Sequence, residues 1–224
     1  MSQVLWRRGR ALGIAGMLAA IVVAGGFVFL RGQPAHAGGN GCGTSGATPV
    51  CSFSGNTAFA QFQTNTDCIS TAANVFVSDD VTRNPPNAGA GGVDVQLGVE
   101  SDNFCTGTFD SASGETTNAT FSLMDPLKSA TLSATVPMTD DFDPAQTFTI
   151  TVNLTWQAYG PTSTQIDSSH FRTNGTIFSS HFHGTGRNAR CSGSISDGTT
   201  EYAPNPSINN TIQHTDNGTI SITH

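Results

Sequence analysis

The chain has 224 residues, of which 37% are hydrophobic and only 11% are charged, and its formal net charge at pH 7 is −7. So few charges exclude a coiled coil, and the length excludes two large domains joined by a linker. The acidic balance argues against nucleic-acid binding, which needs a basic surface.

The first 37 residues differ in composition from the rest. Arg7, Arg8 and Arg10 form a positive segment, an uncharged apolar run covers residues 11–30, and Pro-Ala-His-Ala follows at 34–37. This order is typical of a bacterial signal peptide cleaved after Ala37, so we expect a secreted, extracellular protein. If the segment stayed uncleaved, its apolar run could anchor the chain in a membrane instead. Cleavage leaves five bases against sixteen acids, a formal charge of −11, and no other membrane span.

Residues 38–55 are rich in Gly, Ser and Thr and show no periodicity, so we expect a flexible lead-in before one domain over 56–224. Alternation of apolar and polar residues then predicts strands at 69–77, 93–99, 104–109, 119–123, 130–136 and 147–156. The loop expected at 79–92 contains Pro85-Pro86, and a tight turn is expected at Ser101-Asp102.

The alternation is clearest over 147–156, where Trp156 ends a row of five apolar residues that should face a core. No stretch after Leu30 shows a helical period. The prediction is an all-β protein, an antiparallel β-sandwich of about 8–10 short strands. A sandwich is preferred over one sheet closed on itself because the connections vary in length.

All five cysteines lie after the signal segment, where export permits disulfides. We expect Cys68 and Cys105 to be bridged, because both lie at the same end of the predicted sheet. A Cys42–Cys51 pair would close a small loop in the lead-in. Cys191 would then remain unpaired, and it should be buried because a thiol packs as a small apolar group.

The stretch 168–196 contains three arginines and three histidines but no acid. Asn174-Gly175 predicts a two-residue hairpin, which sets His170 opposite Ser179, and a second turn is expected at about Thr185-Gly186. These two turns would bring five basic residues to one polar sheet face, His170, Arg172, His181, His183 and Arg190, with a sixth, Arg187, at the second turn. Arginine forks and imidazoles suit carboxylate, sulfate or phosphate oxygens, so we expect an anionic ligand there.

The function expected from these patterns is an exported, non-catalytic binding or surface-structural module with no cofactor. Its partner would be an anionic glycan or a cell-surface component, and the oligomeric state stays open. One alternative is a carbohydrate-binding module, with its aromatic platform drawn from Trp156, Tyr159 or Tyr202. The other is a metal-dependent enzyme centred on His181-x-His183, which lacks a third ligand within reach of both imidazoles. We therefore assign no catalytic or metal-binding residue.

Overall fold

The computed structural model describes residues 50–79, 81–84, 92–173, 176–203, 207 and 209–223. The expected signal peptide, its cleavage site and Cys42 lie outside these ranges. Within them the chain forms strands and no helix, as the alternation predicts, and none of its elements is an apolar helix long enough to cross a membrane. The strands are β1 (Val50–Asn65), β2 (Ile69–Ser78), β3 (Val81–Asn84), β4 (Asp94–Asn103), β5 (Thr108–Thr116), β6 (Ala119–Met124), β7 (Ser129–Asp140), β8 (Thr147–Ala158), β9 (Ser163–Thr173), β10 (Thr176–Ser196) and β11 (Asn209–Thr223).

β1 begins earlier than the composition suggests. Its first residues fall in the stretch 38–55 that was expected to be a flexible lead-in. They form a strand because β11 pairs with one edge of β1 and β3 with the other. Tertiary pairing here overrides a local sequence with many turn-forming residues.

All eleven strands of the described part belong to one antiparallel sheet. Nine of them follow the order β11-β1-β2-β4-β5-β7-β8-β10-β9, and β3 and β6 lie off this order, paired with β1 and β7. Since β10 also pairs with β11, the hydrogen-bonded order returns to its start. The expected two-sheet sandwich is therefore not confirmed. Alternation predicts which face of a strand is buried, and it carries no information on whether the strands form one sheet or two.

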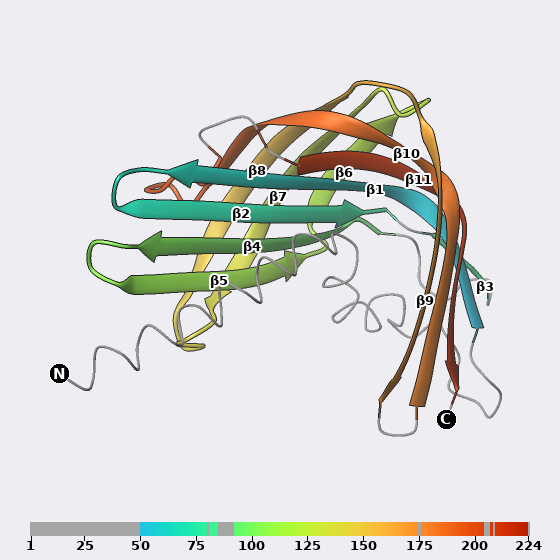
Figure 1. Cartoon of the computed structure of the whole chain (residues 1–224), viewed down its shortest axis with the longest axis horizontal. Coiled ribbons are helices and arrows are strands. Elements are labelled where there is room, and N and C mark those ends of the chain that lie inside the picture. The colour runs from blue at the N-terminus through green and yellow to red at the C-terminus, as the bar shows by residue number, and fades with distance from the viewer. Residues whose placement is uncertain are drawn as a thin grey trace.

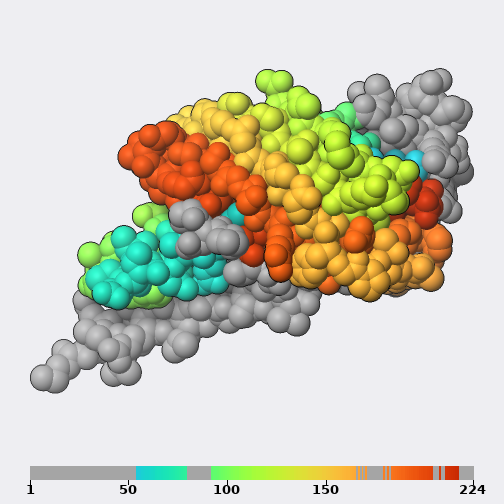
Figure 2. Space-filling model, turned by 90° about the horizontal axis from the view of Figure 1, so that it is seen from above, coloured from blue at the N-terminus to red at the C-terminus, as the bar shows by residue number. Residues whose placement is uncertain are grey.

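The core lies inside the curved sheet and consists of the inward residues of nearly every strand. β7 and β8 alternate between buried and exposed residues along their length, as predicted for 147–156. Trp156 is fully buried, and its indole Nε1 donates to the backbone oxygen of Phe59 on β1 at 2.9 Å. The outward residues of β7, β8 and the second half of β10 are mostly Ser and Thr, and these strands lie side by side in Figure 2.

A disulfide joins Cys68 to Cys105, with the Cα atoms 5.2 Å apart, and this confirms the predicted pair. The turn expected at Ser101-Asp102 is displaced, because β4 continues to Asn103 and the turn follows it. Cys105 therefore lies in the turn after β4, and β4 is the direct neighbour of β2, with Asn103 opposite Ile69. Cys191 is buried and unpaired, as expected.

β10 is long enough for its two halves to pair with different strands. Its second half, from Ala189 to Ser196, pairs with β8 beside the core. Its first half pairs with β9 on one edge and with β11 on the other. We call this part the overhang: β9, residues 176–188 of β10, residues 211–223 of β11 and the start of β1. The overhang curves away from the rest of the sheet at one end (Figure 1).

Candidate functional site

The hairpin predicted from Asn174-Gly175 has the expected register. Thr173 lies opposite Thr176, and His170 lies opposite Ser179. The second turn at Thr185-Gly186 is wrong, because β10 runs without interruption through both residues. That stretch remains a strand because β9 and β11 pair with its two edges, and β11 follows more than twenty residues later in the chain, beyond any local pattern.

The histidines of β9 and β10 share one exposed face of the overhang. Along β10 this face also carries Ala189 and Cys191, which are buried where the strand passes the core. Beyond the core the same face carries His181 and His183 and is exposed. The side chains become polar where the strand leaves the core and its inner face meets water.

Hydroxyl groups hold two of these imidazoles from the neighbouring strand. His170 Nδ1 lies 2.9 Å from Ser179 Oγ, and His181 Nδ1 lies 2.9 Å from Ser168 Oγ. Each pair is a directly opposed cross-strand pair in the β9–β10 ladder. Because the contacts use Nδ1, they leave Nε2 of each ring as the atom available to a ligand.

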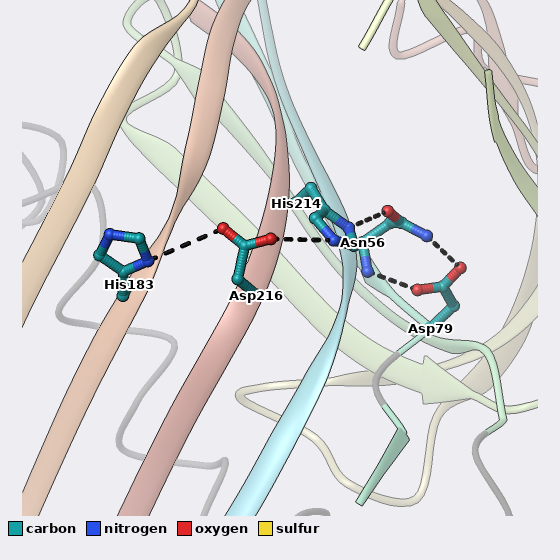
Figure 3. Close-up of polar contacts among 5 residues, drawn as sticks. All are labelled: Asn56, Asp79, His183, His214 and Asp216. Atoms are coloured by element: carbon teal, nitrogen blue, oxygen red, sulfur yellow. Dashed lines mark hydrogen bonds and ion pairs between the residues drawn. The ribbon is translucent and has the colours of Figure 1, made fainter. Parts of the chain in front are cut away.

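A carboxylate from β11, that of Asp216, lies beside the histidines of this surface. Asp216 is an extra residue in β11, since His183 lies opposite Asn217 and Gly184 lies opposite Thr215. Such a bulge reorients a side chain that regular pairing would direct elsewhere. Asp216 Oδ2 lies 3.7 Å from His183 Nδ1, and Asp216 Oδ1 lies 3.5 Å from His214 Nε2 (Figure 3). All three side chains are about half exposed.

The chain of contacts continues from His214 into β1 and the end of β2. Asn56 Nδ2 donates to Asp79 Oδ2 at 2.9 Å, and Asn56 Oδ1 lies 2.8 Å from His214 Nδ1 (Figure 3). Because a carboxylate can only accept, Asp79 fixes the orientation of the Asn56 amide. The amide oxygen then faces His214, whose Nδ1 must donate. His214 Nε2 carries a second proton for Asp216 only when the imidazole is cationic.

The three arginines of the predicted site occupy different environments. Arg187 donates from Nε and Nη2 to the backbone oxygen of Gly160, at 3.1 and 2.8 Å, and from Nη1 to that of Leu127 at 3.3 Å. It therefore ties the joint between β8 and β9 to the β6–β7 turn. Arg190 lies on the opposite face of β10 from His183, stacked over the Tyr159 ring at 5.6 Å from its centroid. Arg172 lies in β9 opposite Ile177, and its side chain is outside the described part.

Local sequence patterns do not reveal the carboxylate of this surface or the residues that β11 and β1 contribute to it. His214 and Asp216 come from β11, and Asn56 from β1. No local signal marks them, because Asp216 precedes Asn217-Gly218, a pair that reads as a turn although it lies inside a strand. The window 168–196 contains no acid in sequence, yet the fold sets a carboxylate beside it.

The arrangement does not favour a metal shared by His181 and His183. His181 is held toward β9 by Ser168, and His183 faces Asp216 on β11, so neighbours on opposite edges of β10 draw the two rings apart. In the described ranges no group of three or more His, Cys, Asp or Glu side chains is placed to hold a metal ion.

The aromatic residues considered for a sugar platform are separated. Trp156 is in the core. Tyr159 N donates to Asn188 O, and Tyr202 N donates to Ile195 O, so the two tyrosines attach to β10 seven residues apart. At the strand rise this is about 23 Å, too far for one continuous platform.

Comparison of the chain with models of protein families, with curated proteins and with solved structures found no match.

Proposed function

We propose that the protein is an exported, non-catalytic binding module that recognises an anionic ligand on the histidine face of the overhang. This face comprises His170, His181, His183 and His214. The observation that carries the proposal is the way the first three imidazoles are held: each is exposed, and each has its Nδ1 beside a neighbouring strand's side chain. Their Nε2 atoms are the groups left for a ligand.

Imidazoles attract an anion only when protonated, and histidine side chains in general take up a proton between pH 5 and 8. Binding should therefore strengthen as the pH falls through this range. Asp216 competes with the ligand for His183 and His214, so its carboxylate should weaken anion binding at every pH at which it is ionised. The ligand class is a carboxylate, sulfate or phosphate, as carried by an acidic glycan or a cell-surface component.

Export is part of the proposal. The signal-like residues 1–37 support it, and so does the Cys68–Cys105 disulfide, since such bonds persist in oxidising compartments. Exposure to an acidic extracellular surface or medium would then supply both the ligand and the pH at which the histidine face is cationic.

The test compares binding to immobilised dextran sulfate and to uncharged dextran, at pH 5.5 and pH 8 and at low and high salt. The parent protein should bind only the sulfated polymer, more tightly at pH 5.5, and less tightly in high salt because exposed charges are screened. Replacement of His170, His181 and His183 together by Gln should remove most of the pH-dependent part of the binding and leave the share due to His214. Asp216→Asn should strengthen binding to the sulfated polymer.

Arg190→Ala is the matched control, because it removes a cation from the opposite face of β10. It should leave dextran sulfate binding unchanged. Equal binding by the triple histidine variant and the parent at pH 5.5 would refute the proposal.

A further inference from the structure

β9 is an edge strand with unusual length. It pairs with β10 over all eleven of its residues, and it is the last strand in the sheet order, so in the described part of the chain its other edge carries no partner strand. The other strands with a single partner, β3 and β6, have four and six residues. A free edge presents a row of backbone N–H and C=O groups that can pair with a further strand.

Several of the usual protections of an edge strand are missing from β9 in the part of the chain that the structure describes. Its sequence STQIDSSHFRT contains no proline and no lysine, and its ladder with β10 shows no bulge. Ile166 is 66% exposed on this strand. A long, unbulged edge with an exposed aliphatic side chain is a site for strand addition.

The hairpin register shows which residues direct their backbone groups outward. A two-residue connection makes the flanking pair, Thr173 and Thr176, a hydrogen-bonded pair. Alternation along β9 then turns the backbone groups of Ile166, Ser168 and His170 away from β10. The close side-chain contacts of Ser168 with His181 and of His170 with Ser179 agree, because non-hydrogen-bonded pairs bring side chains nearer.

We propose that this edge pairs with β9 of a second copy of the same chain, antiparallel, so that one sheet continues across a symmetric dimer. A two-fold axis perpendicular to the sheet sets residues of the same face opposite one another. With the axis at Ser168, the hydroxyl of Ser168 meets its own copy, and the exposed Ile166 lies opposite His170 of the second copy.

Charge favours this edge for contact between copies. Each copy carries a net negative charge, so like molecules repel over most of their surface. β9 contains one acid and one base, Asp167 and Arg172, and has no net formal charge. The pairing would also place the histidine faces of two copies side by side, although it does not depend on anion binding.

The experiment measures the molar mass of the exported protein by sedimentation velocity over a concentration series. The parent should show a concentration-dependent dimer. Ser168→Pro removes an edge-facing N–H and leaves the β9–β10 ladder donors in place, so it should give a monomer. Ile166→Lys adds the charge that natural edges use against pairing and should also give a monomer. Thr149→Lys, which adds the same charge to the exposed face of the central strand β8, should remain dimeric.

Circular dichroism shows whether each variant is folded, and Ile166→Lys decides the question if Ser168→Pro is not. A parent that stays monomeric at the highest concentration would overturn the proposal. So would a folded Ile166→Lys variant that dimerises as the parent does.

Discussion

Replacing Trp156 by Ala tests whether the inward face of β8 holds the sheet together. Trp156 is fully buried, and its indole N–H donates to a backbone oxygen of β1, which is separated from β8 by β10 and β11. Removing a buried Trp side chain costs about 3–5 kcal/mol through lost transfer free energy and the cavity that remains. For a domain of this size each kcal/mol corresponds to roughly 2–4 °C, so the melting temperature should fall by roughly 6–20 °C.

The assay is thermal and urea unfolding followed by circular dichroism, because the substitution removes the fluorescent reporter itself. Trp156→Phe keeps an aromatic ring and loses the hydrogen bond, so it should fall between the parent and Trp156→Ala. Thr151→Ala changes an exposed position of the same strand and should alter the free energy of unfolding by about 0.5 kcal/mol or less. A loss below about 1 kcal/mol for Trp156→Ala would refute the assignment of this residue to the core.

Three further predictions follow from buried or cross-linked groups. The Cys68–Cys105 bond joins residues 37 apart in sequence. The Cys68→Ala/Cys105→Ala variant should have a free energy of unfolding about 4 kcal/mol lower than the parent in denaturant titrations. An unchanged denaturation midpoint would contradict this. Burial raises the pKa of the Cys191 thiol to about 12, so a thiol reagent at pH 8 should label Cys191 only after unfolding. Stability should also decline as the pH rises above about 9, because the Cys191 thiol ionises there in the unfolded chain and stays protonated in the folded one. Partial burial, with a smaller contribution from Asp141, raises the pKa of the Glu100 carboxyl. The folded state therefore holds that proton more tightly than the unfolded state, and the protein loses stability as the pH rises above the ordinary pKa that the carboxyl has in the unfolded chain. Glu100→Gln should therefore raise the melting temperature at pH 7 and change it little at pH 4; the same gain at both pH values would count against this explanation.

The sequence by itself determined the strand class and the inward faces of the strands. The alternation over 147–156 placed Trp156 in the core because successive side chains of a strand point to opposite faces. Asn174-Gly175 set the β9–β10 register because a two-residue turn leaves one way to pair the flanking residues. These are local properties, decided by neighbours within a few residues.

Only the tertiary structure decided how the strands assemble and which groups meet on the overhang. Gly184 and Gly186 lie within a strand because β11 pairs with them from a distant part of the sequence. That pairing displaced the expected turn, moved Arg190 to the opposite face and brought Asp216 beside His183. The physical reason is that pairing between distant strands depends on closure of the whole sheet around its core, and no local spacing in the sequence records that closure.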